Sequence, residues 1–185
     1  MTRAWMLACA AALSLNACNR AEEAGEARPT SDKAAEAAGD KTLAAGLGGT
    51  PKFAAAVKAA GLEAALAGPT PYTVLAPSDA AFDALPPEAA ERLMKPEARK
   101  ELTAVLSNHI LPGTMLATDI GRAIDGGGGK ASIRTLGGGT LTASRSGDKL
   151  VFADAAGTRA TVLEGGGERS NGAIYPIDAV LMPTK

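Results

Sequence analysis

The chain is poor in aromatic residues and in cysteine, and it has no excess of charge of either sign. Aromatic residues make up 3% of its 185 residues, although 46% are hydrophobic, so a core must be built mainly from Ala, Leu, Val and Ile. Lys and Arg number 19 against 20 Asp and Glu, which gives no electrostatic basis for binding nucleic acid. The length suits a single domain with a real core.

Histidine is scarce as well, because His109 is the only one in the sequence. A hydrolytic triad would have to combine it with Ser78 or Ser107, and neither serine lies in a G-x-S-x-G turn. Zinc needs three or four His, Cys or carboxylate ligands, for which one histidine is a poor start. We therefore predict no catalytic residues, no cofactor and no metal. We interpret His109 as a structural residue that bonds a carbonyl where a helix ends.

The glycine run at 126–129 does not form a nucleotide-binding motif. Residues 126–130 read GGGGK, but Ile124 and Ala131 stand where the phosphate-binding loop requires glycine and Ser or Thr. The run fits the dinucleotide pattern loosely, yet it leads into β-type residues and not into a helix that would hold a pyrophosphate. We interpret it as a flexible surface loop.

The N-terminal segment has the features of a secretory signal. The apolar run 5–15 follows Arg3 and is too short to span a bilayer as an anchor. It ends in LNAC at 15–18, which resembles the bacterial lipobox. This resemblance implies a signal peptide over 1–17 and membrane attachment by lipid on Cys18. An ordinary signal peptide with a chance cysteine is the alternative. Cys9 would be removed, so the mature chain would hold no disulfide.

We expect residues 18–41 to form the lipidated cysteine and a flexible tether. Residues 19–41 contain no large apolar side chain, so they cannot bury enough surface to fold alone. A coil of this length would reach roughly 25 Å. Asn19 follows the cysteine at a position where the inner-membrane retention signal favours aspartate. We therefore expect export across the inner membrane and an anchor in the outer membrane, with its periplasmic or surface face left open.

Patterns after residue 42 change from helical to strand-like. Helices are predicted over 51–60 (with Thr50 as cap and Gly61 as stop), 62–66, 79–85, 88–94 and 97–107. Strands are predicted over 72–76, 131–136, 140–144, 149–153 and 159–163, and SGDK at 146–149 predicts a hairpin turn. Helices first and strands later favour an α+β fold.

The motif APSDAAF at 76–82 places serine and aspartate at the end of a predicted strand. Pro77 cannot donate to a strand ladder, so the strand should end there. Ser78 can accept from the free N–H groups of the next helix, and Asp79 puts a negative charge in its first turn. Phe82 and Leu85 should then point to the core. We interpret the pair as a helix start and not as a catalytic site.

Three segments together resemble the fasciclin-domain family in order and spacing. YTVLAPSDAAFDALP resembles the family's first signature, LTAVLSNHILPG its central segment and SNGAIYPIDAVLMP its second signature. The resemblance covers about residues 42–185. It implies a fasciclin-like α+β fold, with a wedge-shaped β-sandwich core and a bundle of short α-helices. The motif positions, which we expect to be mainly structural, are Pro77, Ser78, Asp79, Phe82, His109, Pro112, Gly113, Asn171, Gly172 and Asp178.

Three residues depart from the family pattern. Asn108 replaces the tyrosine of the central Tyr-His pair, Tyr175 stands where histidine is usual, and Pro176 follows it. Proline lacks a backbone donor, so Pro176 predicts a sheet edge or a bulge. In animal members the pair and the signature aspartates are linked to adhesion through receptors. One residue of the Tyr-His pair is replaced here. The resemblance therefore supports the fold more strongly than it supports an adhesive role for these residues.

Two functions from different classes follow. The first is a non-enzymatic, lipid-anchored envelope protein that acts in cell adhesion or matrix binding through an unidentified protein or polysaccharide partner. The alternative is a binding or sensory lipoprotein that faces the periplasm and takes a small ligand or an envelope polymer. A hydrolase is disfavoured, because no nucleophile, base and orienting group converge.

Overall fold

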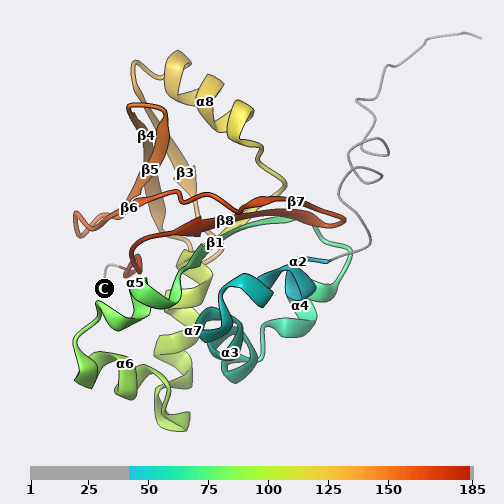
Figure 1. The fold of residues 1–185 in the computed structure, drawn as a ribbon, viewed down its shortest axis with the longest axis vertical. Coiled ribbons are helices and arrows are strands. Elements are labelled where there is room, and N and C mark those ends of the chain that lie inside the picture. Colours follow the sequence, from blue (N-terminus) through green and yellow to red (C-terminus); the bar gives the residue numbers. More distant parts are fainter. Residues whose placement is uncertain (1–41, 184–185) are drawn as a thin grey trace, which may run out of the picture.

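The computed structural model describes residues 42–183. The predicted signal peptide (1–17), the lipidation site Cys18 and the tether up to residue 41 lie outside the described residues. The fold is α+β, with two four-stranded sheets and a group of short helices (Figure 1), as the sequence predicts.

The helices are short, and none within residues 42–183 is long and apolar enough to span a bilayer. In chain order the helical elements are α2 (Leu43–Gly46), η1 (Leu47–Gly49), α3 (Pro51–Ala60), α4 (Glu63–Ala67), α5 (Asp79–Asp83), α6 (Pro87–Leu93), η2 (Pro96–Ala98), α7 (Arg99–Asn108) and α8 (Ala117–Gly126). Gly61 ends α3 with a φ of 77°, a left-handed conformation that glycine adopts without strain.

The strands form two sheets, which we call the inner and the outer sheet. The inner sheet has the order β2 (Ile110–Pro112), β1 (Tyr72–Pro77), β8 (Gly172–Ile177) and β7 (Gly167–Arg169). The outer sheet has the order β3 (Lys130–Arg134), β4 (Thr140–Ser146), β5 (Lys149–Ala153) and β6 (Arg159–Thr161). β1 and β8 are parallel, and all other neighbouring strands are antiparallel. The predicted hairpin at 146–149 joins β4 to β5.

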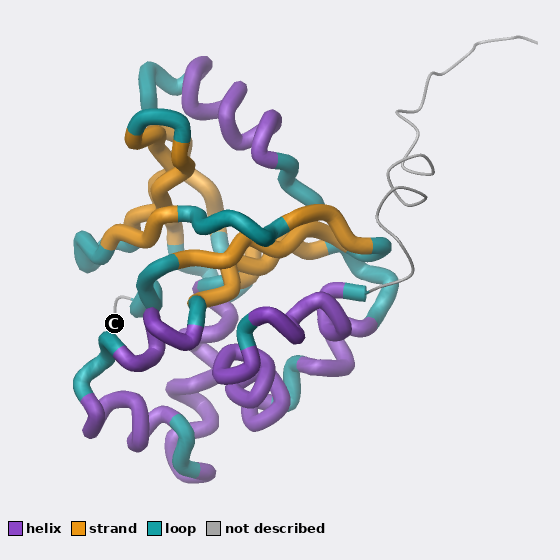
Figure 2. The backbone as a smooth tube through the Cα atoms, viewed as in Figure 1, coloured by secondary structure: helices purple, strands orange, loops and turns teal. Residues whose placement is uncertain are grey.

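The inner sheet is covered on both faces. Val74 and Ile174 on one face pack in a cluster with Phe53 of α3 and with α7. Leu75 and Ile177 on the other face pack in a second cluster with buried residues of the outer sheet and α8. Figure 2 shows helices α2–α7 gathered on one side of the strands and α8 on the other. Because of this double burial, the two central strands β1 and β8 consist mostly of apolar residues.

The outer sheet is half-buried, and its residues alternate accordingly. Leu141 and Ala143 of β4 face the second cluster, whereas Thr140, Thr142 and Ser144 are polar and more exposed. The same alternation places Ile133 and Phe152 inside. It is the pattern expected of an antiparallel sheet with one face open to solvent.

Helix α8 is the longest element that sequence patterns missed, and the short elements α2, β2 and β7 were missed as well. Only Ile120, Gly121 and Ile124 are buried along it, so its apolar face is narrow. A Cβ at Gly121 would collide with the Arg145 guanidinium, so the side chain of Arg145 can lie across the helix only because this residue is glycine. Gly126 of the glycine run is the last residue of α8, and the rest of the run forms an exposed turn into β3.

Candidate functional site

The first family signature forms the junction between β1 and α5. β1 ends at Pro77, and the Ser78 side chain accepts a hydrogen bond from the Ala81 N–H at 3.2 Å. The Ser78 N–H donates to the Ile177 carbonyl at 2.9 Å, which ties the junction to the end of β8. Phe82 is half-buried and packs against the cluster that contains Phe53 and Val74. The helix start predicted from the sequence is present.

Asp79 caps a helix other than its own. Its Oδ1 accepts a hydrogen bond from the Lys52 N–H at 3.1 Å, at the N-terminal end of α3. The prediction that the Thr50 side chain caps α3 is wrong, because its hydroxyl donates back to the Leu47 carbonyl at 3.3 Å. Lys52 Nζ also pairs with Asp83 of α5. Asp79 and Asp83 therefore hold α3 against α5, which no local pattern in the sequence reveals.

His109 is fully buried at the end of α7. Its Nδ1 donates to the Val105 carbonyl at 2.8 Å, and its Nε2 accepts from the Leu181 N–H at 3.0 Å. This pair of partners requires the neutral ring with its proton on Nδ1. Burial lowers the pKa of His109 from 6.5 to about 4. Since both nitrogens are bonded to backbone, neither is free to act as a base or to bind a metal.

Asn108 is buried against the turn between β3 and β4. Its Oδ1 accepts a hydrogen bond from the Thr135 hydroxyl at 3.3 Å. The Gly137 N–H donates to the Ser107 carbonyl at 3.0 Å, so the turn docks on the end of α7. A Cβ at Gly139 would lie 2.8 Å from Asn108 Oδ1. The glycines at 137–139 thus allow the outer sheet to approach the central segment closely.

The Pro-Gly pair of the central segment closes the end of β2. Pro112 pairs with Tyr72 in the sheet, and the Gly113 N–H donates to the Pro71 carbonyl at 3.0 Å. The buried Thr73 hydroxyl donates to the Gly113 carbonyl and accepts from the Met115 N–H, both at 2.8 Å. Motif reading missed Thr73. The available signal was one polar side chain inside an apolar strand.

Asn171 and Gly172 join the second signature to the N-terminal helices. The Asn171 amide donates to the carbonyls of Leu66 at 2.8 Å and Gly68 at 2.6 Å, and its Oδ1 accepts from the Leu43 N–H at 2.7 Å. A Cβ at Gly172 would overlap the Tyr72 carbonyl oxygen, so this position requires glycine.

Asp178 links the two sheets. Its Oδ1 accepts from the Thr161 N–H of β6 at 2.6 Å, and its own N–H donates to the Thr161 carbonyl at 3.1 Å. The prediction at Pro176 is a sheet edge or a bulge; β8 has a neighbour on each side, but at Pro176 its ladder runs to β1 alone. Strand β7 pairs only with the start of β8, and the Pro176 carbonyl accepts from the Leu163 N–H at 2.7 Å. Proline has no backbone N–H to donate, and Pro176 lies beyond the end of β7, where no ladder bond to that strand is lost.

The three signatures meet around the inner sheet, but they do not assemble reactive groups. The polar side chains at the motif positions bond to backbone groups, and Asn108 bonds the Thr135 hydroxyl. Within residues 42–183 no group of three or more His, Cys, Asp or Glu side chains is placed to hold a metal ion. The motif residues thus form a framework, and a binding surface has to be sought elsewhere on the domain.

Two hollows on the surface are bordered by residues of the family signatures, Phe82 in one and Tyr175 in the other. An apolar groove of about 380 Å³ runs between α3, α5, α6 and α7 and is lined by Phe82, Leu85 and Met94 among others. Met94 is 47% exposed there. A wider, shallower hollow of about 900 Å³ lies between the start of α8 and the segment 162–169. Tyr175 lines this second hollow, its hydroxyl donates to the Met115 carbonyl at 2.9 Å, and burial raises its pKa to about 12.

Comparison with known proteins identifies the family. The model of the fasciclin domain matches residues 48–183. The chain belongs to the fasciclin-domain family, as the motifs predict. A solved structure of a FAS1 domain pair from the insect cell adhesion molecule fasciclin I shares its fold, with a TM-score of 0.57 and 20% identity over 71% of this chain and 44% of that chain.

Three curated relatives illustrate the range of proteins that carry similar domains. The chain is 35% identical to protein sll1483 of Synechocystis over 70% of its length and 64% of the relative. It is 37% identical to transforming growth factor-beta-induced protein ig-h3 of Sus scrofa, over 70% of the chain and 17% of the relative. It is 36% identical to cell surface glycolipoprotein MPB83 of Mycobacterium bovis, over 60% of the chain and 44% of the relative. The chain therefore spans less than two thirds of each of these relatives.

Proposed function

We propose that the protein is a non-enzymatic, lipid-anchored envelope protein whose fasciclin domain binds a partner in cell adhesion or matrix contact. One observation supports this most directly. The polar motif side chains of a fasciclin domain are bonded to backbone here, and the single histidine has no free nitrogen. What remains for function is the surface of the domain. A relative described as a cell surface glycolipoprotein supports the anchor and the location.

The proposed mechanism is display on a tether. Lipid on Cys18 would hold the chain at a membrane, and residues 19–41 would let the domain reach a partner. Individual contacts can then be weak, because many copies on one surface bind a polymer or a neighbouring cell with a much higher combined affinity. This requires no catalytic group in the domain.

The anchor and the exposed location have a direct test in cells that express the full chain. Wild type is expected to incorporate labelled fatty acid and to stay with the membrane fraction, whereas Cys18→Ser should lose both. External protease should remove the domain from intact cells, and cells carrying it should adhere better than cells with Cys18→Ser. Labelled Cys18→Ser would contradict the anchor, and full protection from protease in intact cells would contradict the adhesive role.

A periplasm-facing protein for a small ligand is the second candidate, and the apolar groove favours it. Its volume of about 380 Å³ lies in the range of small-molecule sites. Met94→Trp should fill the groove and prevent the fluorescence increase of a neutral apolar probe such as N-phenylnaphthylamine. Leu136→Trp is the matched control, since Leu136 is another exposed large apolar residue, at 46%. Equal probe binding by both variants would remove the groove from consideration.

A further inference from the structure

One face of the outer sheet is largely exposed, with Val151 in its middle as the one buried residue. The inward residues of the sheet pack in the second cluster, so the alternate residues of its four strands point outward. We call this the open face. Its residues are Lys130, Ser132, Arg134, Thr140, Thr142, Ser144, Ser146, Lys149, Val151, Ala153, Arg159 and Thr161.

The open face combines cations with hydroxyl groups and contains no acidic residue. Four of its residues are Lys or Arg, from β3, β5 and β6, and all four are exposed. None of the four forms an ion pair with a carboxylate in residues 42–183, where the ion pairs involve Lys52, Arg92, Arg122 and Arg145. Six further positions are Ser or Thr. A chain that has no excess of positive charge thus gathers unpaired positive charge on one surface.

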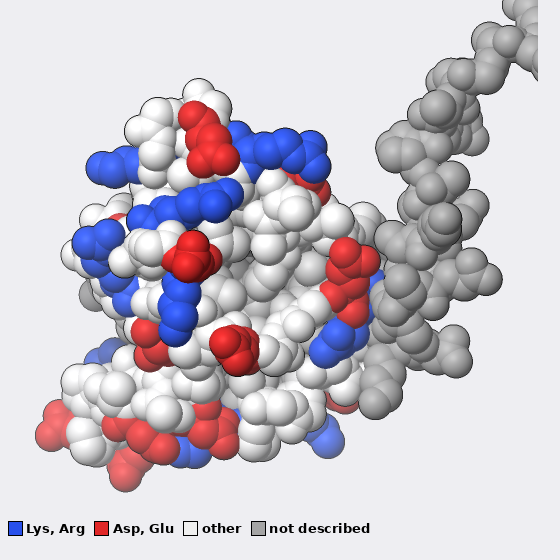
Figure 3. Space-filling model, turned by 45° about the horizontal axis from the view of Figure 1, so that its top comes forward, with Lys and Arg blue, Asp and Glu red and all other residues white. Residues whose placement is uncertain are grey.

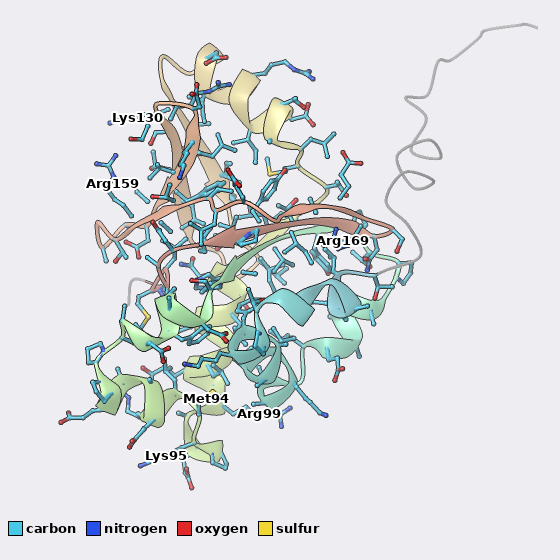
Figure 4. The ribbon with its side chains drawn as sticks, in the orientation of Figure 1. Met94, Lys95, Arg99, Lys130, Arg159 and Arg169 are labelled. Atoms are coloured by element: carbon cyan, nitrogen blue, oxygen red, sulfur yellow. The ribbon has the colours of Figure 1, made fainter. Side chains whose placement is uncertain are left out.

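The strand register sets the spacing of these cations. Lys130 and Arg134 lie four residues apart on β3, which corresponds to about 13 Å. Arg159 on β6 lies three strand spacings from β3, or about 14 Å. Figure 4 shows Lys130 and Arg159 on the same side of the molecule, pointing away from α8. The cations therefore form a broad, flat array and not a pocket for a single anion.

Acidic groups next to the open face are few and partly engaged. Asp148 stands in the β4–β5 turn beside Lys149. Asp178 binds the Thr161 N–H at the edge of β6, and Asp154 bonds the N–H groups of Thr158 and Met182. Figure 3 shows, for one side of the molecule, that most Lys and Arg side chains lie over its upper part and that Asp and Glu side chains gather along its lower edge. Acidic side chains also lie elsewhere on the sheet half, at Asp119 and Asp125 of α8 and in the segment 162–169, but none belongs to the open face.

We propose that the open face binds an anionic polysaccharide. A flat array of separated cations matches the repeated carboxylate or sulfate groups of an extended polymer, and the intervening hydroxyls can bond its sugar hydroxyls. A membrane surface fits less well, because the face has no aromatic or exposed large apolar side chain to insert between lipids. Nucleic acid fits less well because no aromatic side chain on the face can stack on a base. The proposal rests on the proposed function for the location in which such a polymer is met.

The binding is weak for each contact and depends on salt. Exposed cations about 13 Å apart are largely screened from one another at physiological ionic strength, so each contributes independently. Contact with a polyanion releases counterions, and affinity should fall at least roughly tenfold when NaCl is raised from about 50 to about 500 mM.

The experiment compares dextran sulfate and alginate with neutral dextran as immobilised polymers for the purified full-length protein. Wild type should bind the two anionic polymers and not dextran. Lys130→Gln with Arg159→Gln should weaken binding by roughly tenfold, because two of the four cations are lost. The matched control is Lys95→Gln with Lys100→Gln, which removes the same charge from exposed positions on the helical part. This control should bind like wild type.

Four results would overturn the proposal. The first is equal weakening in the open-face and control variants, which would mean that net charge alone matters. The second is binding to dextran equal to binding to dextran sulfate. The third is binding to vesicles of anionic phospholipid as tight as binding to the polymers. The fourth is a wild-type domain that supports cell adhesion but binds neither anionic polymer, and this result would contradict the polysaccharide proposal alone. If the domain binds the polymers but intact cells protect it from protease, the adhesive function alone would be contradicted.

Discussion

The two sheets of this domain differ in what their residues are free to do. The inner sheet is packed on both faces, and all three family signatures meet around it. The outer sheet is packed on one face only, and its other face carries polar and charged side chains without partners in the described chain. The signatures that identify the family therefore lie where substitution should be costly. On the exposed face of the outer sheet, substitutions should change the stability of the fold little, so this surface is free to differ between members of the family.

The sharpest way to break this comparison uses two glycines with positive φ. Gly172 of the inner sheet has a φ of 149° and faces the Tyr72 carbonyl, whereas Gly138 in the turn between β3 and β4 has a φ of 83° and open space around it. Gly172→Ala should lower the free energy of unfolding by more than about 3 kcal/mol, because strain and a backbone overlap add. Gly138→Ala should cost about 1 kcal/mol from strain alone. Urea unfolding followed by circular dichroism measures both, and equal losses would refute the distinction.

A second comparison concerns two buried asparagines. Asn171→Ala leaves one N–H and two carbonyls without their partner, so we expect a loss of about 3 kcal/mol in unfolding free energy. Asn108→Ala removes a single bond to Thr135 at the contact with the outer sheet, so we expect about 1 kcal/mol. The same urea experiment decides, and a larger loss for Asn108→Ala would show that the close turn at 137–139 matters more than the inner sheet.

His109 should make the stability of the domain depend on pH. Its pKa is about 4 in the folded state against about 6.5 when unfolded, so below pH 6.5 the unfolded chain binds a proton that the folded chain refuses. Stability is therefore full above pH 6.5 and falls as the pH drops toward 4, by about 2 to 3 kcal/mol at pH 4.5. His109→Gln should be less stable at pH 7 and should lose this part of the pH dependence. Parallel pH profiles for wild type and His109→Gln would contradict the assignment.

The fold was predictable from the sequence because its informative segments are local or occur in a family order. Ser78 and Gly61 act within a few residues of themselves, so pattern rules place the helix start and stop correctly. Apolar residues at 74–76 and alternation at 140–143 likewise place the strands β1 and β4 correctly.

What the sequence could not predict depends on contacts between distant residues. Asp79 reaches Lys52 across 27 positions, and Asn171 bonds groups more than 100 positions away. Helix α8 was missed because its burial depends on two isoleucines and on the glycine beneath Arg145. The open face was missed for the same reason, since its cations are scattered along the chain and meet only through strand register.

The smallest expected effect sharpens the comparison within a single strand. Ile133 and Ser132 are neighbours on β3, but Ile133 faces the second cluster and Ser132 the solvent. Ile133→Ala should cost about 2 kcal/mol or more, whereas Ser132→Ala should change the free energy of unfolding by less than about 0.5 kcal/mol.

Lys130→Gln with Arg159→Gln should also change the free energy of unfolding by less than about 0.5 kcal/mol, since neither cation has an ion-pair partner within residues 42–183 to lose. A cost above about 1 kcal/mol for this pair would mean that the open face contributes to folding and is not free to specialise in binding.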